Sequence, residues 1–300
     1  MKYTFRPECI INAGDLCGEG ILWLEEESSL YWVDNRRNMI HRHDPGSGSI
    51  QTWKFEETVA SIAATREPGT LCVVLGSRLL LWSPETDRRR AYGPPLMGYP
   101  EVRFNDSGVD INGLLWVGTM GNNLKTDGTK RPVPAGMGTI SRVARGGGRV
   151  EIATDIGVAN TLIWNPHDTC FYTADSSLNI LRSYRYERDT ATVHDPQPLL
   201  FDFPRGRPDG SAIDEEGSIW NCRYGGGCVI RVSPSGAIQQ VVEMPARNVT
   251  SCAFGGRGLK TLYLTTAVSE ENPKSCDGCI FAVDVGVAGK PLYRHDTGAS

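Results

Sequence analysis

The chain has 300 residues, a formal net charge of −4 and a pI near 5.8. A chain of this length can form a single large all-β domain, and we expect one domain over residues 1–300. Its acidic balance offers no basic surface to a phosphate backbone, which argues against nucleic acid as a partner.

Neither the first residues nor any later stretch contains an apolar run of signal-peptide or bilayer-spanning length. We therefore expect a soluble protein that is neither exported nor bound to a membrane. The chain has 9 cysteines, and most lie in apolar runs typical of reduced, buried thiols, which favours the cytoplasm. Cys276 and Cys279 have metal-site spacing, but no second such pair follows, so a turn with two thiols is the better interpretation.

A self-similar unit recurs along the chain. It consists of an apolar strand, a polar turn, a second strand with Trp, Tyr or Phe, and a further hairpin. The second strands are predicted at residues 30–34, 71–75, 114–118, 170–175, 218–221 and 262–266. Their spacing of about 40 to 56 residues is that of a four-stranded propeller blade. Because a sandwich does not ordinarily repeat one unit in this way, we predict an all-β, six-bladed β-propeller with four-stranded antiparallel blades.

The third and fourth strands of these units are also visible in the sequence, and helical periodicity is absent. They are predicted at residues 39–43, 50–53, 78–82, 139–143, 180–186 and 229–232. We interpret the cationic run Arg88–Arg90 as a solvated loop. The apolar run at 279–284 has no full blade after it, so we expect it to pair with the first residues of the chain and close the ring.

Residues 121–136 lengthen the third unit with a polar segment rich in Gly and Pro. Such segments are often functional, and long loops of this kind often act as lids. Two interpretations remain open: a lid over a binding site, or an insertion without a role.

Polar residues at matching positions of different repeats are expected to meet at one end of the propeller. Glu19 lies between two glycines, Asn160 begins an apolar strand, and Asp209 lies in a Pro-Asp-Gly turn before another strand. Each residue alone is commonplace in a turn. Together, two carboxylates and an amide oxygen suit a hard divalent cation, with water in the remaining positions. We expect the histidines, which lie in strands or hairpin turns, to face solvent or pack.

Asp209 is the first catalytic candidate. Pro208 fixes its own φ angle and Gly210 permits a backbone geometry that a side chain would obstruct, so the Asp209 carboxylate can be presented at the start of a strand.

Several motifs occur in a characteristic order: Gly18-Glu19-Gly20, Arg103-Phe104-Asn105-Asp106, Trp116-Val117-Gly118-Thr119-Met120, Pro208-Asp209-Gly210 and Thr250-Ser251-Cys252-Ala253-Phe254-Gly255-Gly256. In these motifs, over nearly its whole length, the chain resembles the family of six-bladed propellers that includes senescence marker protein (regucalcin), gluconolactonase and luciferin-regenerating enzyme. The expected type is a bacterial sugar lactonase.

The resemblance implies a divalent metal at Glu19, Asn160 and Asp209, with Asp209 also acting as general base. It further implies that Arg103 and Asn105 contact a sugar lactone. Two positions depart from the pattern. Thr161 stands where many relatives have a glycine, and Asn123 stands at the expected substrate-binding position where some relatives have a glutamate.

We therefore expect an enzyme that hydrolyses a sugar lactone to the aldonic acid, with the cation polarising the carbonyl and Asp209 taking a proton from water. Oxygen ligands leave the metal open among calcium, zinc, manganese, magnesium and iron(II). Two alternatives remain: a hydrolase of phosphotriesters or other esters on the same metal, and a calcium-binding propeller without catalysis. The sequence does not distinguish pentose from hexose lactones.

Overall fold

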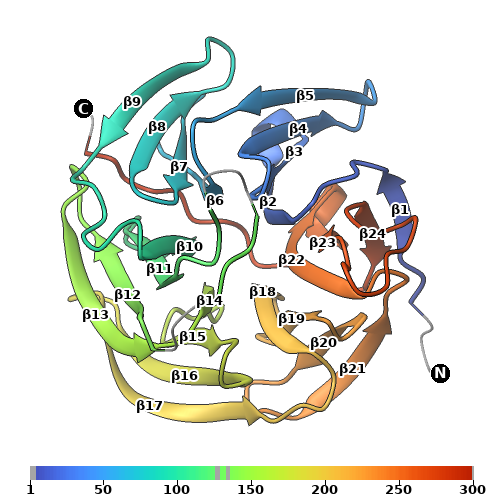
Figure 1. The fold of residues 1–300 in the computed structure, drawn as a ribbon. Helices are drawn as coiled ribbons and strands as arrows, with labels where there is room; N and C mark the ends of the chain where they lie inside the picture. The colour runs from blue at the N-terminus through green and yellow to red at the C-terminus, as the bar shows by residue number, and fades with distance from the viewer. Residues whose placement is uncertain (1–4, 126–128, 133–135, 299–300) are drawn as a thin grey trace.

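The computed structural model describes residues 5–125, 129–132 and 136–298. Its strands form six four-stranded antiparallel sheets, arranged around a central axis like the blades of a propeller (Figure 1). The predicted architecture is confirmed. Two single helical turns interrupt the strands, η1 (Glu25–Glu27) and η2 (Arg257–Leu259). Within the described ranges, no helix is long and apolar enough to cross a membrane.

Each blade contributes one strand to each of four concentric layers. The inner strands are β2 (Gly18–Leu24), β6 (Val59–Ala64), β10 (Val102–Val109), β14 (Ala159–Trp164), β18 (Arg207–Ile213) and β22 (Asn248–Gly255). The second strands are β3 (Ser29–Asp34), β7 (Leu71–Leu75), β11 (Leu115–Gly121), β15 (Cys170–Asp175), β19 (Ile219–Tyr224) and β23 (Thr261–Ala267). The third strands are β4 (Met39–Asp44), β8 (Leu79–Ser83), β12 (Gly138–Val143), β16 (Ile180–Glu187), β20 (Cys228–Val232) and β24 (Ile280–Asp284). The outer strands are β5 (Ser49–Lys54), β9 (Arg88–Tyr92), β13 (Arg149–Ile156), β17 (Thr192–Phe201), β21 (Ile238–Glu243) and β1 (Glu8–Ile11).

Two tryptophans of the second strands are anchored by aspartates in the turns that precede those strands. Trp116 and Trp220 are fully buried, and each indole Nε1 donates to a turn carboxylate at 2.9 Å, that of Asp110 and that of Asp214 respectively. The other oxygen of each carboxylate accepts a backbone N–H of the same turn. This arrangement satisfies the indole N–H within the apolar core between blades and fixes the hairpin that joins the first two strands.

The ring is closed by strands from opposite ends of the chain, as predicted. The strand β1 pairs antiparallel with β24, with Glu8 opposite Ala282 and Cys9 opposite Phe281 (Figure 1). The last blade therefore takes its outer strand from the start of the chain. All the cysteines lie within the described ranges, and each is a free thiol.

The expectation of a solvated loop at Arg88–Arg90 is wrong, because these residues begin the outer strand β9 and pair with β8. The Arg89 guanidinium lies 3.9 Å from the centre of the Phe55 ring and also contacts Asp87. An outer strand has little apolar surface of its own to bury, and long arginine stems can cover its inner neighbour. The charged residues lack the apolar pattern by which a strand is recognised in the sequence, so the strand at residues 88–92 was not predicted.

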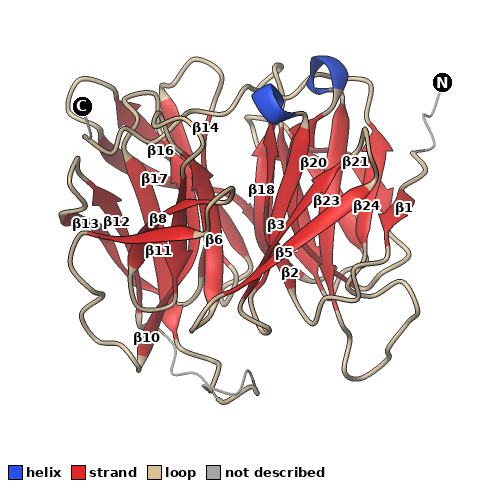
Figure 2. Cartoon of the chain, turned by 90° about the horizontal axis from the view of Figure 1, so that it is seen from above, coloured by secondary structure: helices blue, strands red, loops and turns tan. Residues whose placement is uncertain are grey.

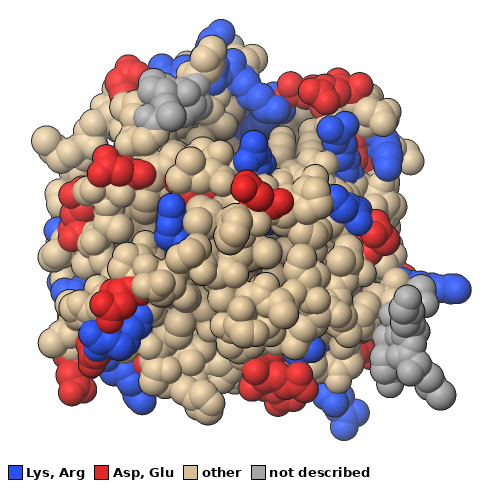
Figure 3. Space-filling view, turned by 90° about the horizontal axis from the view of Figure 1, so that it is seen from below, with Lys and Arg blue, Asp and Glu red and all other residues tan. Residues whose placement is uncertain are grey.

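Charges of both signs are interspersed on the side of the molecule in Figure 3, around a broad area without charged groups. No basic stripe crosses this face, in keeping with the formal net charge of −4.

Residues 289–297 form a strap across one face of the propeller, the face at which η1 and η2 lie (Figures 1 and 2). The strap contacts each blade, through Glu26, Ala64, Gly113, Asp168, Asp214 and Leu259. Together with all six inner strands it lines a cavity of about 170 Å³ on the central axis. The strap therefore covers this end of the central channel.

His295 holds the strap from inside the protein, where its side chain is fully buried. Its Nδ1 lies 2.9 Å from the carbonyl oxygen of Gly113, and its Nε2 lies 2.9 Å from the hydroxyl of Tyr92. A neutral ring with the proton on Nδ1 satisfies both contacts, since Nε2 then accepts from Tyr92. Burial lowers the pKa of His295 below its ordinary value of 6.5, although Asp296 and Asp110 oppose that effect and Arg66 reinforces it.

Acid should weaken the fold through His295. As pH falls below about 6.5, the unfolded chain binds a proton at this residue before the folded chain does, so stability declines until the lower folded pKa is reached. Urea denaturation midpoints measured between pH 7.5 and pH 5.5 should fall more steeply for the wild type than for His295→Gln. Parallel pH profiles for the two proteins would contradict this role.

Candidate metal and active site

The six inner strands share an irregularity at the same level of the channel. In each one the pairing register with the second strand shifts, between Glu19 and Leu22, Val59 and Ser61, Phe104 and Asp106, Asn160 and Ile163, Pro208 and Ser211, and Val249 and Cys252. A bulge of this kind bends a strand and re-aims a side chain. The predicted metal ligands Glu19, Asn160 and Asp209 all lie at these bulges, near the starts of their strands.

Glu19 and Asp209 form a pair of like charges within the protein. Burial raises the pKa of Glu19 well above its ordinary value, and the negative charge of Asp209 raises it further. Burial likewise raises the pKa of Asp209, with a further contribution from Asp106. The backbone N–H groups of Gly20 and Gly210 donate to the two carboxylates and partly offset this effect.

A bound cation would relieve the repulsion between these carboxylates. Among the described residues, neither carboxylate has an ion-pair partner within 4.0 Å. Buried charges in proteins are ordinarily paired or coordinate a metal. Within the described ranges, no three His, Cys, Asp or Glu side chains are arranged to hold a metal. The donor set proposed here has only two carboxylates, and its third member is the amide of Asn160. These residues fit a hard divalent cation.

The amide of Asn160 is oriented by its neighbours. Asn105 Nδ2 donates to Asn160 Oδ1 at 2.9 Å and to the carbonyl of Ala159 at 3.0 Å. Asn160 Nδ2 donates to Ser176 Oγ at 2.8 Å, and that hydroxyl donates to the carbonyl of Pro208. An amide oxygen has two lone pairs, so Asn160 Oδ1 retains one for a ligand. The network also links Asn160 to the residue before Asp209.

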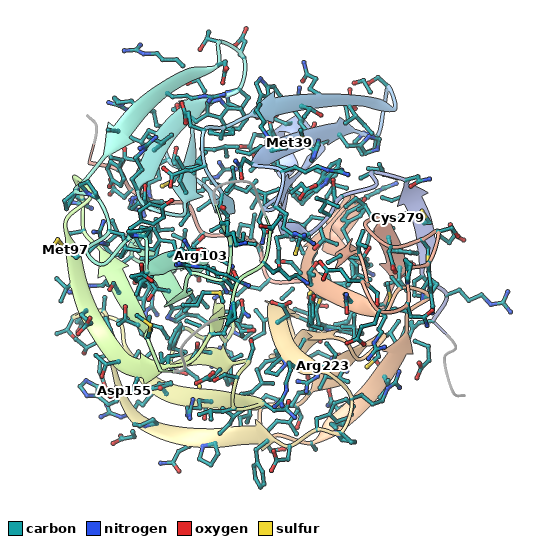
Figure 4. All side chains as sticks on the ribbon, viewed as in Figure 1. Met39, Met97, Arg103, Asp155, Arg223 and Cys279 are labelled. Carbon is teal, nitrogen blue, oxygen red and sulfur yellow. The ribbon has the colours of Figure 1, made fainter. Side chains whose placement is uncertain are left out.

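Arg103 and Asn123 meet beside this network. Arg103 Nη2 donates to Asn123 Oδ1 at 2.9 Å and Nη1 donates to Asn105 Oδ1 at 3.0 Å. Figure 4 shows Arg103 beside the centre of the propeller. Burial lowers the pKa of Arg103 to about 10, which leaves it protonated at neutral pH. Since Asn123 is a neutral partner, the positive charge of Arg103 remains available to a ligand. The structure thus brings Arg103, Asn105 and Asn123 into one cluster.

Sequence reasoning gave no role to three polar residues near the predicted ligands, Asp106, Asn221 and Arg223. Asp106 is surrounded by protein, which raises its pKa to about 6, and it accepts hydrogen bonds from the backbone N–H groups of Ser107 and Thr161. Asn221 donates to the backbone carbonyl of Asp209 at 3.2 Å, and Arg223 holds the Asn221 amide. The signal in the sequence was the alternation of Asn221 and Arg223 with apolar residues in β19, and the position of Asp106 within the motif of residues 103–106.

The connection from β11 to β12 includes residues 122–125, 129–132 and 136–137 of the described chain, and this described part passes in front of the centre of the propeller (Figure 1). Leu124 and Lys130 form an isolated bridge within this segment, and Lys130 Nζ lies 3.2 Å from Glu270 on a loop of the last blade. The described residues of this segment thus lie at the face opposite the strap, where the predicted ligands also lie. Residues 126–128 and 133–135 lie outside the described residues.

The fold and the site define a six-bladed propeller with an oxygen-rich polar cluster at one mouth of its central channel. Residues 17–268 match the SMP-30/Gluconolactonase/LRE-like region. The chain therefore belongs to this family, and the family predicted from the motifs is confirmed.

Particular relatives extend over almost the whole chain. It is 32% identical over 298 residues to the 6-deoxy-6-sulfogluconolactonase of Pseudomonas putida, covering 95% of this chain and 98% of that protein. It is 28% identical over 298 residues to the pentonolactonase of Haloferax volcanii, covering 96% and 97% respectively. The structure of a luciferin-regenerating enzyme superposes with a TM-score of 0.87 at 25% identity, covering 97% of this chain and 99% of that one.

Divalent metal should stabilise the protein through these ligands. An ion that binds only the folded state, present at a free concentration 100 times its Kd, adds about 2.7 kcal/mol to the free energy of unfolding. Thermal unfolding of protein stripped of metal should therefore shift upward on addition of Mn²⁺, and Glu19→Gln should abolish most of that shift. Glu85→Gln, a change on the exposed surface, is the matched control. An equal Mn²⁺ shift in Glu19→Gln and the control would rule out Glu19 as a ligand.

Proposed function

We propose that this protein is a metal-dependent sugar lactonase, which hydrolyses an aldonolactone to the aldonic acid. The observation that supports the proposal is that Glu19 and Asp209 interact electrostatically with each other and with the protonated Arg103. Asn160 is joined to the same group through Asn105, which hydrogen-bonds to both Asn160 and Arg103. Relatives that cover almost the whole chain are named as lactonases of six-carbon and five-carbon sugar acids, which supports the substrate class.

Glu19, Asn160 and Asp209 would hold one divalent cation. Such a cation, when bound, supplies positive charge that stabilises negative charge developing on a carbonyl oxygen. Calcium, zinc, manganese, magnesium and iron(II) all accept oxygen donors of these types. A cation also lowers the pKa of a neighbouring carboxyl, opposing the rise that burial causes at Asp209.

Asp209 is the proposed general base. Water adds to the lactone carbonyl carbon while the Asp209 carboxylate takes one of its protons. The ring C–O bond then breaks, and the proton passes from Asp209 to the departing ring oxygen, leaving a hydroxy acid. The product acid ionises at neutral pH, so each turnover releases one proton to the solution.

Arg103 and Asn105 have the proposed role of binding the sugar. The Arg103 guanidinium stays charged and is held by neutral acceptors, so it can donate to the oxygen on which negative charge develops. Asn123 orients that guanidinium, because its Oδ1 accepts hydrogen bonds from both Nε and Nη2 of Arg103. We propose that Asn123 shapes the choice among lactones by setting the position of Arg103.

The compartment proposed for the protein is the cytoplasm. Each of the cysteines, all within the described ranges, is a free thiol, and such thiols persist where the surroundings are reducing.

Replacing Asp209 with asparagine tests the proposal directly, because it keeps an oxygen donor and removes the base. Acid release from a panel of pentono- and hexonolactones should fall between about 10²-fold and 10⁴-fold in Asp209→Asn. Mn²⁺ binding, measured in parallel by calorimetry, distinguishes loss of the base from loss of the ion. Wild-type turnover in Asp209→Asn would exclude this mechanism, and a wild type that binds Mn²⁺ but hydrolyses no ester would support a binding role.

A further inference from the structure

Thr161 follows the ligand Asn160 and adopts a backbone conformation that β-branched residues rarely take. Its φ angle is +59°. Glycine follows each of the other two ligands: Gly20 has a φ of +52°, and a Cβ at Gly210 would lie 2.8 Å from Ser251 Oγ. Asn160 is thus followed by a non-glycine residue whose backbone is strained. Such a conformation persists only where the surrounding structure holds it.

The contacts of Thr161 reach both neighbouring blades. Its backbone N–H donates to Asp106 Oδ2 at 2.8 Å, on the preceding inner strand β10. Its hydroxyl donates to the backbone carbonyl of Asp209 at 2.7 Å and lies 2.7 Å from Ser211 Oγ, both on the following inner strand β18. Thr161 therefore links three consecutive blades at the level of the site.

The hydrogen bonds around the Asp209 carbonyl are mutually consistent. Asn221 Nδ2 donates to this carbonyl at 3.2 Å and to Ser211 Oγ at 2.9 Å. Ser211 can then donate its own proton to Thr161 Oγ1, which leaves the Thr161 proton for Asp209. The carbonyl of the proposed base thus has two donors, and Thr161 supplies the shorter bond.

We propose that Thr161 is a positioning residue, which fixes the backbone of Asp209 relative to Asn160 through its hydroxyl. This inference rests on the proposed lactonase function and deepens it. The Asn160 amide and the Asp209 carboxylate come from different blades, so their separation depends on contacts between β14 and β18. The Thr161 hydroxyl donates a hydrogen bond directly from the residue after Asn160 to the backbone carbonyl of Asp209.

Three substitutions separate the hydroxyl from the strain. Thr161→Val keeps the shape and removes the hydroxyl, while Thr161→Ser keeps the hydroxyl. Thr161→Gly removes the hydroxyl and takes a positive φ without strain, so it preserves folding. Thr65→Val is the matched control, since Thr65 is buried and its hydroxyl donates to Thr70 within another blade.

Lactone hydrolysis is the first measurement. A small misplacement of a catalytic group can cost up to about 10²-fold in rate. Thr161→Val should lower kcat by about tenfold or more and Thr161→Gly by several-fold, with KM within about twofold of the wild type. Thr161→Ser should restore kcat, and Thr65→Val should retain it. The inference is overturned if Thr161→Val and Thr161→Gly keep the wild-type kcat, or if Thr161→Ser loses as much as they do.

Amide hydrogen exchange of the metal-free proteins tests the same link without activity. Peptides over residues 159–164 and 207–213 should exchange faster in Thr161→Val and Thr161→Gly than in the wild type, whereas Thr161→Ser and Thr65→Val should leave both slow. Unchanged exchange in both strands of Thr161→Gly would overturn the inference. A wild type that hydrolyses no lactone but gives the expected exchange pattern would contradict the proposed function and retain the link.

Discussion

The mutual repulsion of Glu19 and Asp209 is the constraint on which the rest of this site depends. Burial disfavours the charge of both carboxylates, the negative charge of Asp209 raises the pKa of Glu19 further, and each residue lies at a bulge in its strand. Proteins ordinarily retain two buried carboxylates only where a positively charged group or a metal ion lies beside them. In this chain Arg103 supplies one positive charge nearby, and the arrangement of oxygen donors suits a divalent cation as a second.

Rigidity of the site comes from hydroxyl groups that cross between blades. Thr250 Oγ1 donates to the carbonyl of Gly18, and Ser176 Oγ donates to that of Pro208. These two carbonyls belong to the residues immediately before Glu19 and Asp209, and Thr161 holds the carbonyl of Asp209 itself. The backbone of each carboxylate is thus tied to a neighbouring blade, and the strap secures the opposite face. A site supported in this way keeps its geometry when charge is added or removed.

The sequence predicted the parts of the structure that follow a local rule. The second strands repeat because buried strands between blades need apolar and aromatic residues. Glu19, Asn160 and Asp209 could be proposed as ligands from the sequence because they occupy equivalent positions in that repeat. The outer strand β9 was missed, since its charged residues break the apolar pattern. The strap was also missed, because it pairs with no full strand. The contacts of Thr161 and Asn221 join residues of neighbouring strands and depend on bulge geometry, which no spacing in the sequence reveals.

The most direct measurement is acid release from pentono- and hexonolactones by protein stripped of metal and then resupplied with single divalent ions. The stripped protein should hydrolyse lactones no faster than buffer, and at least one ion should restore turnover well above the spontaneous rate. Full activity of the stripped protein would contradict the claim that a cation at Glu19, Asn160 and Asp209 is required. Failure of every ion to restore turnover, in folded protein that binds the ion, would contradict the lactonase itself.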